Sequence, residues 1–179
     1  MKLKNTQILI IESLLGLLEK NDFESLSVAR ITHEALVARN SFYRNFKSKE
    51  DIIRIYIKTL IDEFSQTEQA RKAVKSVSLY AMAMIFFSFF KKHRNFVLVL
   101  NKNHLISILQ DEFARYLEPL IESQPAKTRS NLGWARKDLM YYISFHASGL
   151  CQVLVKWIES QCKETEEEMA RLLNKFVRL

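Results

Sequence analysis

The sequence predicts an all-α protein of about nine helices. Only 3 of the 179 residues are glycine and 2 are proline, so few residues interrupt a helix. Apolar residues recur every three or four positions in the predicted helices, which is the spacing of one helix face. No segment alternates between apolar and polar residues as a half-buried strand does. Because 48% of the residues are apolar, the chain can bury a sizeable core.

Two helices are predicted at the start of the chain. The first covers 6–20 and ends before Asn21 and Asp22. Its apolar face is formed by Ile8, Ile11, Leu15 and Leu18. Ser27 is a preferred N-cap for a second, shorter helix, because its hydroxyl can accept a hydrogen bond from a backbone N–H group of the first turn. The inner face of this second helix holds Val28, Ile31 and Ala35.

A tight turn over 35–37 separates the second helix from a third, predicted over 38–46. Phe42 and Phe46 lie four residues apart, so they share one face and can anchor this helix to the core. Ser48 then caps a fourth helix, and Asp51 completes a start that resembles a capping box. This longer helix is expected to end near residue 64.

The polar residues 65–72 indicate a domain boundary. We therefore expect an N-terminal domain over 1–64 and a helical C-terminal domain over 65–179. Within the second domain a loop containing Pro125 is expected over 123–130. The helices predicted around this loop cover 73–91, 94–101, 103–122, 132–162 and 165–178.

Composition and charge narrow the range of functions. The net charge of +7 favours an anionic partner. The longest run without charge, 76–90, is shorter than the roughly 20 residues that span a bilayer, so no membrane partner is expected. Cys151 and Cys162 are eleven positions apart on one predicted helix and cannot bond to each other, so both are expected to be reduced thiols of a cytoplasmic protein.

Neither an active site nor a metal site is expected. The sequence has no nucleophile with a nearby base and no glycine-rich phosphate loop, so we predict that the chain is not an enzyme and has no cofactor. His93, His104, His146 and the two cysteines lack the tight spacing of metal ligands. A thiol-based redox switch at one of these cysteines stays open as an alternative.

The stretch 27–49 has the pattern of a DNA-reading helix-turn-helix. It holds five Lys or Arg residues against one acid, and two short helices joined by a three-residue turn match the motif. Base contacts are expected from Arg39, Asn40, Ser41 and Tyr43, whose side chains can pair with base edges or donate to them. Phosphate contacts are expected from Ser27, Tyr43, Asn45, Lys47 and Lys49.

The same stretch resembles the DNA-binding domain of the TetR family of transcriptional regulators. The resemblance covers about 6–60 and is carried by Phe42-Tyr43, by Phe46 and by Ser48-Lys49-Glu50. Leu36 departs from the pattern, because it replaces a turn glycine at a position that often needs a positive φ. Asn45 also departs, because it stands where histidine is common.

The C-terminal part is similar to a TetR subgroup that includes activators of dihydroxyacetone-kinase operons. The similarity rests on Tyr141-Tyr142, Ser144-Phe145 and Trp157-Ile158-Glu159. It implies a nine-helix homodimer in which the helices over 132–162 and 165–178 pair as a four-helix bundle. It also implies that a small-molecule effector binds in the C-terminal domain and changes the spacing of the two DNA-reading heads.

The effector site is predicted among the aromatic residues of the C-terminal domain. The preferred candidates are Phe86, Phe90, Tyr142, Phe145 and His146. The basic run 91–94 with Lys102 keeps an acidic effector open as an alternative.

Taken together, these features predict a dimeric repressor that binds a palindromic double-stranded DNA operator and responds to a small effector. A second hypothesis is a helical protein-interaction module or coactivator. In that case the helix-turn-helix would be vestigial, and the basic C-terminal domain would dock an acidic partner such as a metabolic enzyme. Leu36 in the turn is the feature of the motif that favours this second hypothesis.

Overall fold

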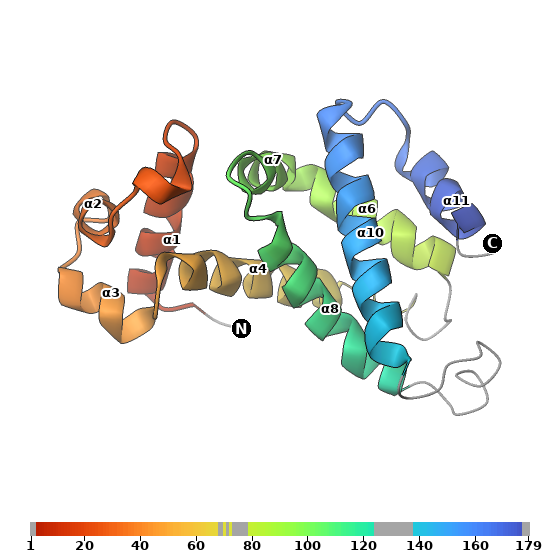
Figure 1. Cartoon of the computed structure of the whole chain (residues 1–179), viewed down its shortest axis with the longest axis horizontal. Coiled ribbons are helices and arrows are strands. Elements are labelled where there is room, and N and C mark those ends of the chain that lie inside the picture. Colours follow the sequence, from red (N-terminus) through yellow and green to blue (C-terminus); the bar gives the residue numbers. More distant parts are fainter. Residues whose placement is uncertain (1–2, 68–69, 71, 73–78, 124–137, 177–179) are drawn as a thin grey trace.

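The computed structural model describes residues 3–67, 70, 72, 79–123 and 138–176, and these described residues form nine α-helices, one 3₁₀ turn and no strand. The predicted all-α fold is therefore confirmed. Figure 1 shows α1, α2 and α3 at one end of the molecule and α10 and α11 at the other, with α4 reaching from the first group to α8. The helices are α1 (Asn5–Leu18), α2 (Val28–Glu34), α3 (Arg39–Asn45), α4 (Lys49–Gln66), α6 (Leu79–Lys92), α7 (Arg94–Lys102), α8 (Ile106–Glu122), α10 (Leu139–Glu159) and α11 (Glu166–Phe176).

Helix α1 ends two residues earlier than predicted and buries a different face. The carbonyl oxygen of Leu17 accepts from the backbone N–H of Asn21 at 3.0 Å and from the Asn21 side chain at 2.8 Å, which caps the last turn of the helix. The buried residues of α1 are Ile10, Ile11, Leu14, Leu17 and Leu18. Ile8 was predicted on the buried face, but it is 37% exposed, because the face that packs on α2 and α4 is centred on Leu14.

Helix α2 begins as predicted, with the Ser27 hydroxyl accepting from the backbone N–H of Arg30 at 3.2 Å. It ends in a Schellman motif. The N–H of Val37 donates to the Thr32 carbonyl at 3.0 Å, and the N–H of Leu36 donates to the His33 carbonyl at 3.1 Å. Leu36 sits at the position where this motif needs a left-handed backbone, and its φ is 52°. The expected positive φ of this turn is confirmed.

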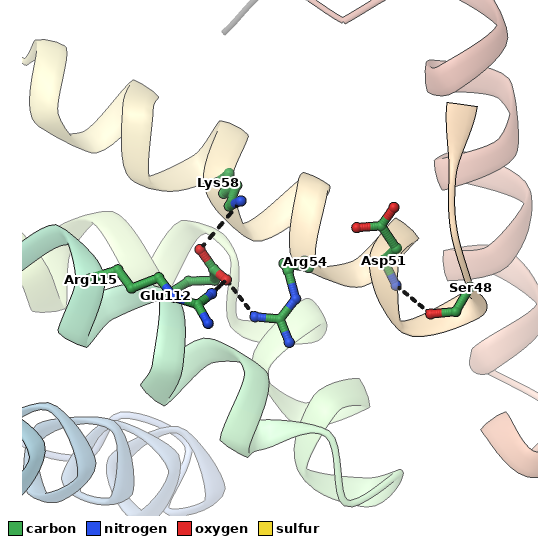
Figure 2. Close-up of polar contacts among 6 residues, drawn as sticks. All are labelled: Ser48, Asp51, Arg54, Lys58, Glu112 and Arg115. Atoms are coloured by element: carbon green, nitrogen blue, oxygen red, sulfur yellow. Dashed lines mark hydrogen bonds and ion pairs between the residues drawn. The ribbon is translucent and has the colours of Figure 1, made fainter. Parts of the chain in front are cut away.

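Helix α4 starts with the predicted Ser48 cap, whose hydroxyl accepts from the N–H of Asp51 at 3.3 Å (Figure 2). The Asp51 carboxylate accepts from the N–H of Lys47 at 2.9 Å and not from that of Ser48, so the second bond of a capping box is shifted by one residue. The hydrogen bond from Ser48 also lowers the pKa of the neighbouring Glu50 carboxyl. These bonds fix the angle at which the chain leaves α3 and enters α4.

The C-terminal helices pack in two pairs, α10 along α8 and α11 along α6. Aromatic rings fill the space between them. The Phe86 ring lies 5.1 Å from the Phe113 ring of α8, and the Phe87 ring lies 5.1 Å from the Trp157 ring of α10. No helix in the described part of the chain is long and apolar enough to cross a membrane. The predicted starts of the helices over 73–91 and 132–162, and most of the loop over 123–130, lie outside the described residues.

Both cysteines carry free thiols, as predicted. Cys151 is buried in α10, and burial raises the pKa of its thiol to about 12. Cys162 follows the end of α10, and burial also raises the pKa of its thiol. A thiol with a raised pKa is less often ionised, so neither environment favours a reactive thiolate.

Candidate functional site

Helix α3 is held against the N-terminal core by two phenylalanines. Phe42 is fully buried and Phe46 is 2% exposed, and their ring centroids lie 5.8 Å apart. The Phe42 ring also meets the edge of the Tyr43 ring at 5.2 Å. These contacts fix the rotation of α3 about its axis, so the opposite face is directed away from α1 and α2.

That outward face is polar and positively charged. Arg39, Asn40, Tyr43 and Arg44 are all exposed, and α3 contains no acidic residue. The Arg39 guanidinium donates to the Tyr43 hydroxyl at 3.2 Å and lies 5.7 Å from the centre of the Tyr43 ring. The two side chains therefore form one surface along the first turn and a half of the helix, where a recognition helix meets base edges.

Ser41 and Asn45 are half-buried on the flank of α3 and are engaged within the helix. The Asn45 side-chain amide donates to the Ser41 carbonyl at 2.7 Å, and Arg44 donates to the Ser41 hydroxyl at 3.1 Å. To contact DNA, both side chains would have to exchange these bonds for new ones. Their roles as a base contact and a phosphate contact stay predictions.

The other predicted phosphate contacts flank α3. Ser27 is exposed at the start of α2 and Lys47 is exposed before α4. Lys49 is different, because its ammonium donates to the Phe23 carbonyl at 2.9 Å and lies 4.5 Å from the centre of the Phe23 ring. Lys49 therefore ties the start of α4 to the segment between α1 and α2, a role that the sequence analysis missed.

Arg44 was not among the predicted contact residues, although it lies on the same outward face as Asn40. The signal was present in the sequence, because Arg44 follows Asn40 by four positions and such residues share a helix face. Its contact with Ser41 places Arg44 beside the residues that are predicted to contact bases.

A buried carboxylate joins helix α4 to the C-terminal helices. The Glu112 side chain of α8 is 2% exposed and accepts from Arg54 of α4 at 2.5 Å. Lys58 of α4 lies 3.9 Å from the same carboxylate, and Arg115 of α8 also pairs with it. Figure 2 shows the three cations converging on Glu112 from two helices.

A second link connects the same two parts. The Asn103 side-chain oxygen, at the end of α7, accepts from the backbone N–H of Phe23 at 2.8 Å. Its amide nitrogen donates to the Val99 carbonyl at 2.9 Å. The segment between α1 and α2 is thus held both by Lys49 of α4 and by Asn103 of α7.

The five predicted effector residues fall into different environments. Phe86 and Phe90 lie in the core, with ring centroids 4.8 Å apart. Tyr142 and His146 are half-buried on α10 and their rings lie 4.0 Å apart, and burial raises the pKa of Tyr142 and lowers that of His146. Phe145 is 74% exposed. Tyr142 and His146 stay predictions for effector contact, whereas the exposure of Phe145 favours a different role.

The basic run 91–94 borders a cavity of about 350 Å³ at the turn between α6 and α7. Tyr56 of α4 reaches the same cavity, and its ring meets the edge of the Phe96 ring at 4.8 Å. Lys91 is also paired with Glu166 of α11 at 2.9 Å. Among the described residues, no three His, Cys, Asp or Glu side chains are placed to hold a metal ion.

Comparisons with known proteins agree with this geometry. Residues 10–54 match the family model described as bacterial regulatory proteins of the tetR family, and residues 77–179 match the model described as a transcriptional regulator C-terminal region. No curated protein matches the chain.

Three solved structures share the fold. Lin0861 from Listeria innocua is 16% identical, with a TM-score of 0.74 over 99% of this chain and 94% of that one. The fatty acid degradation regulator FadR from Bacillus halodurans is 14% identical, with a TM-score of 0.59 over 99% and 96%. The dihydroxyacetone kinase operon activator DhaS is 16% identical, with a TM-score of 0.51 over 96% and 93%.

The two family models cover the helix-turn-helix and the whole C-terminal set of helices. The chain is thus a member of the TetR family of transcriptional regulators, and α2 and α3 form its DNA-binding helix-turn-helix.

Proposed function

We propose that the chain represses transcription by binding a palindromic operator as a homodimer, and that a small effector controls this binding. The observation that carries the proposal is the outward face of α3, which is polar, free of acidic residues and fixed by the buried Phe42 and Phe46. A rigid face of this kind can present Arg39 to guanine and Asn40 to adenine. Two copies would place their α3 helices in successive major grooves, about 34 Å apart.

Exposed aromatic residues on each of the last two helices support the homodimer. Tyr141 and Phe145 of α10 are 70% and 74% exposed, and Phe176 of α11 is 52% exposed. Gly149 follows Phe145 by four positions on the same face of α10, and a Cβ atom added there would meet nothing within 4 Å. Because glycine has no side chain, another helix can approach α10 closely at this position, and exposed aromatic rings are typical of protein interfaces. We therefore assign Phe145 to the interface between two copies, where self-complementary faces meet.

Control by an effector is supported by the links between α4 and the C-terminal helices. Glu112 of α8 holds α4 through Arg54. A ligand that moved α8 would therefore also move α4, which directly follows α3 in the chain. The ligand must bind the two arrangements with different affinity to shift their balance. We propose Tyr142 and His146 as contacts for this effector, and the cavity beside Tyr56 as the alternative for an acidic one.

The sign of regulation is part of the proposal. One structural neighbour is named as an operon activator and another as a degradation regulator. If the dimer covers a promoter, it blocks transcription, so we expect repression. We also expect the protein to act in the cytoplasm on chromosomal DNA. In a reconstituted transcription assay on the selected operator, added protein should lower transcript yield.

The first test is selection of bound duplexes from a random DNA library at about 150 mM salt, where non-specific binding is weak. Enrichment of an inverted repeat would support a sequence-specific dimer, and its position near a promoter would identify the regulated genes. Recovery of DNA without a motif would contradict the proposal. It would favour the protein-interaction module, which a pull-down with the purified protein would then test.

A further inference from the structure

Leu36 combines two unfavourable properties in one turn. Its backbone has a φ of 52°, a region that leucine rarely adopts, and its side chain is 91% exposed. The residues on either side behave normally, since Ala35 is 4% exposed and Val37 packs against the core. The Schellman motif at the end of α2 forces the backbone of Leu36 and turns its side chain outward.

The same motif occurs at two other helix ends without an apolar residue at the strained position. At the end of α7 the position is taken by His104, with a φ of 59°, and at the end of α10 by Gln161, with a φ of 62°. Histidine and glutamine can be solvated there, whereas leucine exposes a branched hydrocarbon to water. Of the three positions, Leu36 alone faces water with an apolar side chain and adjoins the recognition helix.

The location of Leu36 indicates what covers it. Leu36 lies two positions before Ala38, the N-cap of α3, and three before Arg39. The N-terminal end of a recognition helix is the end that meets base edges. Figure 1 shows the turn between α2 and α3 at the end of the molecule opposite α11. On the proposed function, that end faces the operator.

We propose that Leu36 is a specificity-determining residue that contacts the 5-methyl group of a thymine in each half-site. Thymine is the base that presents an apolar group in the major groove, and apolar side chains recognise it there. Backbone strain beside a binding surface is typical of a functional position. The contact would remove the leucine side chain from water and so favour the bound state.

The inference rests on the proposed function and is tested on the operator that the wild-type chain selects. Each thymine of a half-site is replaced in turn by deoxyuridine, which lacks only the methyl group. The wild-type chain should lose about fourfold in affinity at one thymine, the value of one buried methyl group. Leu36→Gly and Leu36→Ala should bind the thymine and deoxyuridine duplexes equally at that position.

Measurements of thermal stability distinguish the effect of the Leu36 side chain from the effect of its strained backbone. Leu36→Gly should raise Tm by about 2–4 °C because glycine adopts a positive φ without strain, while its DNA selectivity falls. Leu36→Ala keeps the strained backbone and should lose selectivity without that rise in Tm. Gln161→Gly is the matched control, because it relieves the same motif at the end of α10 and should raise Tm with unchanged DNA binding.

Three results would overturn the inference alone. The first is a wild-type chain that binds every deoxyuridine duplex as tightly as the thymine duplex, and the second is a set of Leu36 variants that keep the wild-type preference. Equal weakening of the variants on all DNA would also overturn it, because that result indicates a contact with the sugar-phosphate backbone. A wild-type chain that selects no duplex would overturn the proposed function together with the inference.

Discussion

The Arg54 guanidinium of α4 donates to the buried Glu112 carboxylate of α8 at 2.5 Å, across 58 positions of the sequence. The Arg54 side chain is 28% exposed, whereas that of Glu112 is 2% exposed. An acid buried to this degree is stable only if its charge is matched, and Arg54, Lys58 and Arg115 match it. The pairing therefore fixes how the helix that leads to α3 lies on the C-terminal helices.

Replacing this carboxylate should destabilise the fold. Glu112→Gln keeps the shape but removes the charge, so we expect a loss of about 1–3 kcal/mol in the free energy of unfolding. Urea denaturation would measure it. The matched control is Glu167→Gln on α11, which breaks the exposed pair with Arg171 and should cost at most ~0.5 kcal/mol. Equal effects of the two variants would show that Glu112 has no special role.

Base reading by Arg39 makes a different kind of prediction. Arg39→Ala should weaken operator binding by about 1–3 kcal/mol and should relax the preference at one base position. Binding curves on operators with single base changes, measured at constant salt, would resolve the affected position. Uniform weakening on every operator would assign Arg39 to the phosphate backbone instead.

Replacement of Lys47 and replacement of Lys49 should have different effects on thermal stability. Lys47 is exposed, so Lys47→Ala should weaken binding to all sequences and lower the slope of log K against log salt by about 0.9, with no change in Tm. Lys49 holds the Phe23 carbonyl, so Lys49→Ala should lower Tm as well as DNA affinity. A salt titration and a melting curve of each variant provide both measurements. An unchanged Tm for Lys49→Ala would leave the phosphate role as the whole of its function.

These residues also show what could be predicted from the sequence. The caps at Ser27 and Ser48 and the anchors Phe42 and Phe46 act within one or two helical turns, so local spacing was sufficient to predict the helix-turn-helix. The contact between Lys49 and Phe23 spans 26 positions. No local pattern indicates such a contact, and the prediction of Lys49 as a phosphate contact could not include it.

The C-terminal domain was harder to predict for a related reason. Phe86 and Phe145 are both aromatic residues on apolar helices, yet one is 2% exposed and the other 74%. Periodicity identifies an apolar face but does not say whether it packs within the chain or against another molecule. Glu112 is the opposite case, a charged residue that is buried. Its sequence position next to Asp111 predicts a surface residue, and only its partners on α4 explain why it lies in the interior.

The exposed aromatic residues of α10 predict how the homodimer can be broken. Phe145→Glu places a charge in each copy at the proposed two-fold interface, so the protein should become monomeric at micromolar concentration. Sedimentation equilibrium would measure the molar mass. Leu9→Glu is the matched control, because Leu9 is 45% exposed on α1, away from α10. A dimer that persists in Phe145→Glu would place the interface elsewhere, and loss of the dimer should also abolish tight binding to the inverted repeat.

Stability should fall as the pH drops below about 6.5. Burial lowers the pKa of His146, and it lowers that of His93 against the opposing charge of Glu63. Below the ordinary histidine pKa of about 6.5 the unfolded chain therefore binds protons that the folded chain does not, which favours unfolding. Urea denaturation at pH 7.5 and pH 5.5 would measure this loss.

Urea denaturation of a histidine variant at the same two pH values would show which side chain causes the loss of stability. His146→Gln should flatten the dependence of stability on pH between 7.5 and 5.5 relative to the wild-type chain. The carboxyl groups of Glu50 and Glu166 have lowered pKa values because of hydrogen bonds from Ser48 and Lys91, so they lose their contribution only in more acidic solution. An unchanged pH dependence in His146→Gln would show that its burial is not maintained in solution.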